Sequence, residues 1–274
     1  MKKSGSGKFA RTWLALFLAV AVAVGLAPSR ASAQSGNTTP ASTNKGPVNE
    51  ELIRKANESY YYLQSQGLKA FQCKIQLSWK QSAGDPSNLE QLNQIRFSVV
   101  VDDQGAANVT PFLASGAPID HSQNEMVSGA QQTVEGFFQS WDNFVFLGIF
   151  NASDEEALSS PSEQPDGFHF TGRSGDANME LVLTKDALLT TMKIATPSTI
   201  IVMQPKFTKT ERGLLLMTSM DADINNGTQA LKMQIQYQQV EGFQLPAKAD
   251  FRVTLPTQVV SLEMSFTDYQ LTKR

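Results

Sequence analysis

The chain has 274 residues, of which 41% are hydrophobic and 18% charged, so it is long enough to bury the core of a globular domain. Its formal net charge is −3, and the basic residues among the first 33 leave about −8 for the remainder. This acidic balance argues against binding nucleic acid and against docking on anionic lipid through a basic patch. The single cysteine, Cys73, excludes a framework of intramolecular disulfides and is interpreted as a small buried hydrophobic residue.

Residues 1–33 carry the pattern of a secretory signal peptide. Four Lys or Arg residues precede an apolar run, and Ala31-Ser32-Ala33 supplies a small-x-small cleavage pattern. The run of about 15 residues is shorter than the roughly 20 that a membrane-spanning helix needs. We therefore expect cleavage near Ala33 and an exported, soluble mature protein in the periplasm or outside the cell.

Residues 34–47 are rich in Ser, Thr, Asn and Gly, and we expect a flexible leader here, before a single domain over residues 48–274. That domain begins with a predicted helix capped by Asn49 and ended by Gly67. The apolar residues whose helical spacing predicts it are Leu52, Ile53, Ala56, Tyr60 and Leu63.

Two predicted strands follow, over residues 71–80 and 94–101, because apolar and polar side chains alternate in both. Trp79 lies on the apolar face of the first strand and Phe97 on that of the second. The run Asp102-Asp103-Gln104-Gly105 predicts a turn at the end of the second strand.

Residues 123–151 change to helical spacing and are unusually aromatic. We predict one helix of about six turns, or two shorter helices broken near Gly136. The aromatic side chains expected to cover the sheet are Phe137, Phe138, Trp141 and Phe144. An acidic segment over 153–166 then predicts a surface loop or a mobile flap.

Residues 179–270 read as one alternation of polar and apolar residues after another. Short turns join the strands, at Lys185-Asp186, at Asn226-Gly227 and at Glu241-Gly242, so the connections are too short for crossover helices. The pattern predicts an antiparallel meander, with about eight to eleven strands in the whole domain. Such a sheet has one apolar face that must be covered or used.

Few residues in the chain point to catalysis. Its two histidines cannot build a three-histidine zinc site, and neither a nucleophile elbow nor a phosphate-binding loop occurs. His121 is interpreted as a loop residue, and His169 as a strand residue that points to solvent. Asp221 to Asn225 has the alternating oxygens of a calcium loop but lacks its glycine and its closing glutamate, so a polar hairpin end is the better interpretation. We predict no catalytic residue, metal or cofactor.

The order of the elements resembles the periplasmic lipoprotein-carrier family over most of residues 48–274. The sequences that carry this resemblance are Val240-Glu241-Gly242-Phe243-Gln244-Leu245-Pro246 and the closing Phe266-Thr267-Asp268-Tyr269. The family includes the lipoprotein chaperone of the bacterial envelope, its outer-membrane receptor and related lipid-binding domains. No motif around Arg96, Arg173, Arg212 or Arg252 identifies the family's regulatory arginine, so no functional residue is carried over.

The resemblance implies an α+β fold, mostly antiparallel, in which a curved open half-barrel is lidded by the N-terminal and central helices. Acyl chains would lie between the sheet and these helices. The residues predicted to line such a cavity, if they do not simply fill a core, are Trp79, Phe97, Met192, Met220, Met233, Phe251 and Met264. Methionine suits this role because its unbranched thioether adapts to irregular ligands.

The first functional hypothesis is therefore a non-enzymatic carrier or binding protein that shelters the acyl chain of a lipid or lipoprotein. A second is a scaffold of the cell envelope that fills its own core and binds a protein partner through its acidic surface. A third is a hydrolase that acts through paired carboxylates or His169.

Overall fold

A computed structural model describes residues 47–81, 90, 92–119, 125–148, 161–174 and 177–274. The predicted signal peptide, most of the predicted leader and His121 lie outside the described residues. The elements are α2 (Pro47–Ser59), β1 (Leu68–Gln81), β2 (Ile95–Val101), β3 (Ala107–Leu113), α4 (Glu125–Trp141), the π-helix η1 (Asp142–Phe146), β4 (Ser162–Gln164), β5 (Gly167–Ser174), β6 (Ala177–Leu183), β7 (Leu189–Ala195), β8 (Ile200–Lys209), β9 (Leu215–Ile224), β10 (Gln229–Val240), β11 (Phe243–Thr254) and β12 (Val259–Lys273).

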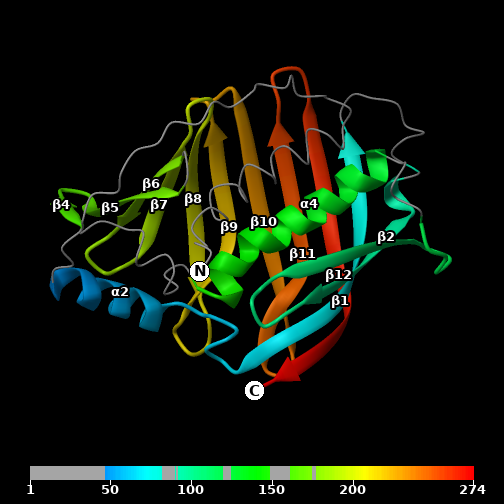
Figure 1. Ribbon diagram of the computed structural model, residues 1–274, viewed down its shortest axis with the longest axis horizontal. Helices are drawn as coiled ribbons and strands as arrows, with labels where there is room; N and C mark the ends of the chain where they lie inside the picture. The colour runs from blue at the N-terminus through cyan, green and yellow to red at the C-terminus, as the bar shows by residue number, and fades with distance from the viewer. Residues whose placement is uncertain (1–46, 82–89, 91, 120–124, 149–160, 175–176) are drawn as a thin grey trace, which may run out of the picture.

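All twelve described strands belong to one antiparallel sheet, in the order β3-β2-β1-β12-β11-β10-β9-β8-β7-β6-β5-β4. Strands that are consecutive in sequence pair with each other, except β3 and β4. Strand β1 also pairs with β12, which joins the two ends of the domain (Figure 1). The edge strands β3 and β4 do not pair with each other, so the sheet is open. The predicted meander of residues 179–270 is confirmed.

The alternation that predicted the strands appears as alternating burial. In β10, buried Leu231, Met233 and Ile235 alternate with exposed Lys232 and Gln234. We call the face that carries the buried set the inner face and the opposite, polar face the outer face. Helix α4 runs diagonally across the inner face (Figure 1).

The sheet has more strands than the eight to eleven that were predicted, and two of them gave little sequence signal. Strand β4 consists of three exposed residues, so no apolar alternation marks it. Strand β3 contains Pro111, which cannot donate a backbone hydrogen bond and is tolerated here because β3 is an edge strand.

Helix α2 is shorter than predicted, because it ends at Ser59 and not near Gly67. The next residues pair with other elements: the backbone N–H of Tyr61 donates to the Leu215 carbonyl at 2.9 Å, and that of Leu63 to the Val145 carbonyl at 2.7 Å. These tertiary hydrogen bonds outweigh the helical spacing of the side chains. Asn49 lies inside the helix, which begins at Pro47, and is therefore not its cap.

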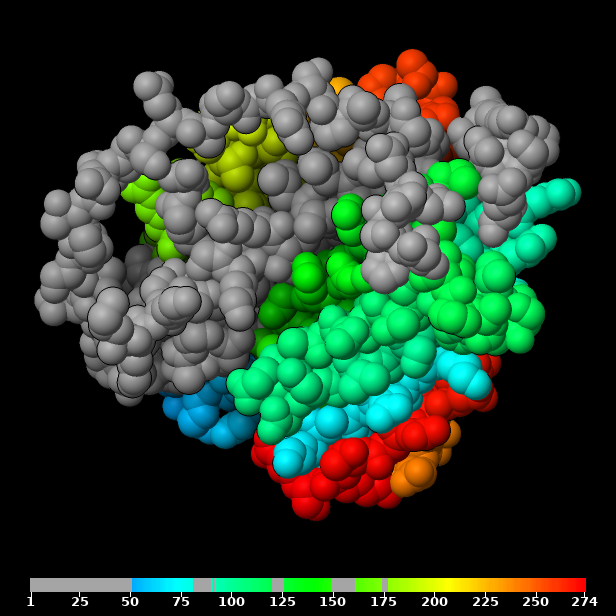
Figure 2. Space-filling model, turned by 45° about the vertical axis from the view of Figure 1, so that its right-hand side comes forward, coloured from blue at the N-terminus to red at the C-terminus, as the bar shows by residue number. Residues whose placement is uncertain are grey.

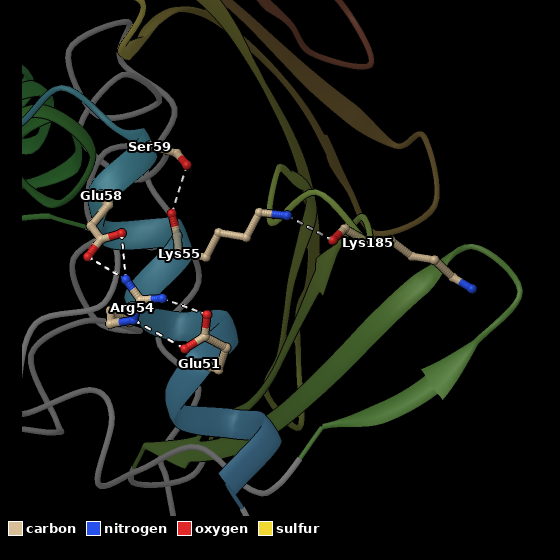
Figure 3. A network of polar contacts seen from close by, with 6 residues as sticks. All are labelled: Glu51, Arg54, Lys55, Glu58, Ser59 and Lys185. Atoms are coloured by element: carbon tan, nitrogen blue, oxygen red, sulfur yellow. Dashed lines mark hydrogen bonds and ion pairs between the residues drawn. The ribbon is translucent and has the colours of Figure 1, made fainter.

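One side of α2 is held by charges and the other by apolar burial. Arg54 bridges Glu51 and Glu58, and Lys55 donates to the Lys185 carbonyl at 3.5 Å, in the turn between β6 and β7 (Figure 3). Leu52 and Ala56 are buried on the opposite side. The exposed ion pairs contribute little to stability, so we attribute the docking of α2 mainly to its apolar side.

The central helix is also corrected by the structure. It continues through Gly136, where a break was considered, and ends at Trp141. The chain then widens into the π-helix η1 from Asp142 to Phe146. A π-helix is rare and is often found at functional sites, because it displaces side chains from their α-helical positions.

The predicted hairpin turns are confirmed by backbone angles. Asn225, Asn226 and Gly227 have φ values of 51°, 56° and 86°, and Glu241 and Gly242 have 49° and 94°. Glycine and asparagine tolerate this left-handed region better than other residues. Asp223 closes the first turn by accepting the N–H of Gly227 at 2.7 Å, which supports the interpretation of Asp221 to Asn225 as a polar hairpin end.

Gly167, at the start of β5, should tolerate no side chain. Its φ is +142°, and a Cβ atom there would lie 2.1 Å from the carbonyl oxygen of Leu183 on β6. We predict that Gly167→Ala lowers the free energy of unfolding in urea by about 3 kcal/mol. The control Gly213→Ala also has a positive φ, of +79°, but nothing within 4 Å, and should cost about 1 kcal/mol. Equal effects of the two substitutions would show that the close approach to Leu183 does not limit this position.

Candidate functional site

The inner face carries a continuous row of large apolar side chains that crosses five strands. Register places Met220 of β9 opposite Met233 of β10, Met233 opposite Phe251 of β11, Phe251 opposite Leu262 of β12, and Leu262 opposite Trp79 of β1. Each of these residues is at most 3% exposed. At about 4.8 Å per strand, the row is roughly 19 Å long. We call it the inner row.

Helix α4 covers the β1, β11 and β12 part of this face with aromatic rings. Phe137 contacts Phe251 and Phe266 at ring-centroid distances of 6.0 and 5.3 Å, and Phe138 and Trp141 both contact Phe71 at 6.1 Å. Figure 2 shows α4 in bright green against the band formed by β2 and β3, next to β1 and β12. The rings of α4 therefore contact side chains of the inner face, and the role of the helix as a lid remains a prediction.

The polar groups of α4 are satisfied in ways that allow the helix to be buried. Thr133 and Ser140 are fully buried, and their hydroxyls donate to the carbonyls of Gly129 and Gly136, one turn earlier. Because these bonds stay within the helix, they tie α4 to no other element. Movement of the helix away from the sheet would leave them intact.

One hydrogen-bonded chain does tie the end of α4 to the sheet. The Trp141 indole N–H donates to the Tyr237 hydroxyl at 3.2 Å, and that hydroxyl donates to the Met217 carbonyl at 2.6 Å. Burial raises the pKa of Tyr237, so the phenol stays protonated and remains a donor. This chain crosses from α4 through β10 to β9.

Trp79, at the end of the inner row, has a polar group that finds no such partner. Its side chain is 3% exposed, and its indole N–H has no acceptor in the part of the chain that the structure describes. A buried donor without an acceptor costs about 1–3 kcal/mol. The backbone N–H of the same residue is satisfied by the Asn93 side chain at 2.7 Å.

The structure places every residue that was predicted to line a cavity in the buried core. Trp79, Met220, Met233 and Phe251 come together in the inner row. Met264 and Phe97 are fully buried on β12 and β2, and Met192 lies opposite Met203 on β7 and β8. Whether any of them contacts a ligand stays a prediction. The predicted lining omitted Leu262 and Met203, which the alternation of β12 and β8 places on the same face.

The predicted lid residues are likewise buried. Phe137, Phe138 and Trp141 belong to α4, and Phe144 belongs to η1. Their role as a movable cover remains a prediction.

Asp142 is the second buried polar residue without a partner, and it begins the π-helix. It is 2% exposed, and neither carboxyl oxygen has a hydrogen-bond partner among the described residues. Burial raises the pKa of Asp142 well above its usual value, and the negative charge of Asp102 raises it further. The carboxyl oxygen Oδ2 lies 3.5 Å from the position that a Cβ atom would take at Gly105, so the turn between β2 and β3 packs against it.

Stability should therefore decrease as pH rises, over a range set by Asp142. The unfolded chain releases this proton near pH 4, whereas the folded protein keeps it until the pH passes the raised pKa. Between these two pKa values, the free energy of unfolding should decrease by up to about 1.4 kcal/mol per pH unit. We predict that Asp142→Asn removes this part of the pH dependence in urea unfolding. Asp102→Asn, which removes the neighbouring charge, should reduce it only in part. Parallel pH profiles for Asp142→Asn and the original protein would contradict the assignment.

His169 was predicted to point to solvent, but its side chain is held by two carboxylates. Its side chain is 11% exposed, and its two ring nitrogens lie 2.9 Å from a Glu180 oxygen and 2.8 Å from an Asp166 oxygen. These hydrogen bonds raise the pKa of His169 and favour the charged imidazolium. Because carboxylates engage both ring nitrogens, His169 is poorly placed to act as a general base.

The remaining polar groups of the described residues suggest no other chemical centre. Cys73 is buried, and burial raises the pKa of its thiol to about 12, which favours the unreactive form. No group of three or more His, Cys, Asp or Glu side chains within the described ranges is arranged to hold a metal ion. None of the helices described combines the length and apolar composition needed to cross a membrane.

Comparisons with known proteins find similarity only at the level of structure. No protein-family model matches the chain, and no curated protein matches it in sequence. A DUF1329 family protein from Desulfovibrio piger aligns with 82% of this chain and 92% of its own, at 7% identity and a TM-score of 0.27. A domain described as an outer membrane lipoprotein-sorting protein, from Vibrio parahaemolyticus, aligns with 81% and 91%, at 9% identity and a TM-score of 0.25. Scores of this size assign neither a fold family nor an activity.

Proposed function

We propose that the protein is a non-enzymatic binding protein that shelters the acyl chain of a lipid or lipoprotein on the inner face of its sheet. The observation that carries the proposal is the inner row, which ends at the unpaired indole N–H of Trp79. An acyl ester needs a long apolar track and one hydrogen-bond donor for its carbonyl oxygen. The row from Met220 to Trp79 offers both.

Binding would proceed by burial of the chain. Each CH2 group removed from water contributes about 0.8 kcal/mol, so a palmitoyl chain gains on the order of 10 kcal/mol before ordering costs. The ligand would replace the rings of α4 on the row, because Phe137 packs directly against Phe251. The helix would move as a unit, since the hydroxyls of Thr133 and Ser140 are satisfied within it.

The role of Trp79 gives the proposal a specific test. We predict that the protein binds palmitoyl lysophosphatidylcholine about three- to tenfold more tightly than the hexadecyl ether analogue, which lacks the ester carbonyl. Trp79→Phe should abolish this preference and should cost less stability than Trp141→Phe, because both lose the same ring volume but the Trp79 indole N–H has no partner in the described part of the chain. Titration calorimetry measures the two affinities, and urea unfolding measures stability.

Trp141→Phe is the matched control. It also removes an indole N–H, but one that donates to Tyr237. It should lower stability by about 1 kcal/mol and keep the preference for the ester. Equal affinity of the original protein for ester and ether would remove the role of Trp79, and a failure to bind either lipid would refute the acyl-binding function.

The scaffold with a self-filled core is the second candidate. It is favoured by the burial of the predicted cavity residues, each of which is at most 3% exposed. A scaffold would bind neither lysolipid, with or without the Trp79→Phe substitution. The same titrations therefore separate the two functions.

A further inference from the structure

The outer face carries a hollow that the acyl-binding proposal does not use. It has a volume of about 300 Å³ and lies over β1, β10, β11 and β12. Its lining includes the cations Lys80, Lys232 and Arg252, the hydroxyls of Ser78 and Ser261, and the carboxylates of Asp250 and Glu263. These residues alternate along their strands with members of the inner row, so the hollow lies on the opposite side of the sheet.

The three cations lie in a single cross-strand row. Register places Lys80 opposite Ser261, Ser261 opposite Arg252, and Arg252 opposite Lys232. Like charges directly opposite each other on adjacent strands are destabilising. The Arg252 and Lys232 side chains therefore repel each other. Asp221 of β9, opposite Lys232 on its other side, offsets part of this repulsion, and a bound anion would offset more.

The acidic residues near this row are engaged by other lysines. Lys248 lies 2.9 Å from Glu263 and 3.4 Å from Asp250, and Lys206 lies 2.8 Å from Asp221. By contrast, no carboxylate oxygen of the described residues lies within 4.0 Å of the charged nitrogens of Lys80, Lys232 or Arg252. With three cations and two carboxylates, the lining carries one net positive charge, on a chain whose formal net charge is −3.

The chemistry of the row fits a phosphate group. A phosphate ester carries a charge of about −1.5 to −2 near neutral pH and offers three oxygen acceptors. Arginine can bind two of these oxygens at once, and lysine and serine supply further donors. From the hollow, the unpaired cations and Ser261 between two of them, we propose that the outer face binds a phosphate group, free in solution or in a lipid headgroup.

The test compares soluble and membrane-bound phosphate. Inorganic phosphate and glycerol 3-phosphate are titrated calorimetrically at constant ionic strength set with chloride. In parallel, the protein is sedimented with phosphatidylcholine vesicles with and without phosphatidic acid. Binding of the soluble ions identifies a site for free phosphate. Binding only to vesicles that contain phosphatidic acid identifies the lipid headgroup as the source. Binding in neither assay overturns the proposal.

Variants decide whether this row is the site. Lys232→Gln with Arg252→Gln should weaken binding about tenfold or more. Without phosphate, the same variant should melt at the same or a higher temperature, because it removes a repulsion. Lys193→Gln with Lys209→Gln makes the same change in charge at two other exposed lysines and should leave binding unchanged. Equal weakening by both double variants would show a general effect of charge and overturn the site. The single variant Lys232→Arg should bind phosphate as the original protein does, because it keeps the positive charge.

Discussion

The fold depends on one constraint, the need to cover a continuous apolar face on an open sheet. Twelve antiparallel strands place their buried side chains on a single side, and edge strands β3 and β4 do not close the sheet into a barrel. Apolar surface of this extent is not stable in water. Helix α4 meets the constraint over β1, β11 and β12 with the rings of Phe137, Phe138 and Trp141. Strand β1, near the start of the domain, pairs with β12 at its end. This pairing brings the strands that contact α4 into one surface.

Much of this arrangement could be predicted from the sequence, because period-two alternation is set by strand geometry alone. The meander was predicted on that basis, its turns at Asn226-Gly227 and Glu241-Gly242 from their residue types, and the aromatic helix from its helical spacing. The end of α2 could not be predicted from the sequence. Tyr61 and Leu63 leave helical geometry because they form hydrogen bonds with Leu215 and Val145, which are remote in the chain. The π-helix that begins at Asp142 and the pairing of His169 with Glu180 also depend on contacts that no local pattern encodes.

The candidate sites show the same division. Each apolar residue of the inner row could be assigned to a face, but their alignment from Met220 to Trp79 requires the register of four strand pairs. The unpaired indole N–H of Trp79 depends on what surrounds it in three dimensions. The acidic composition argued against nucleic acid and against a basic patch for anionic lipid, because net charge averages over the whole surface. Register gathers Lys80, Arg252 and Lys232 into one row that the average conceals.

The unpaired groups of Trp79 and Asp142 mark where folding alone leaves polar atoms unsatisfied. Trp79 ends the inner row, which we assign to an acyl chain. Asp142 begins the π-helix η1, which directly follows α4. We propose that this row holds a lipid. The most direct measurement is native mass spectrometry of the purified protein, followed by mass spectrometry of its organic extract beside an equally treated protein that binds no lipid. The account predicts a stoichiometric acyl species, before or after exposure to lipid vesicles. An empty protein under both conditions would contradict it.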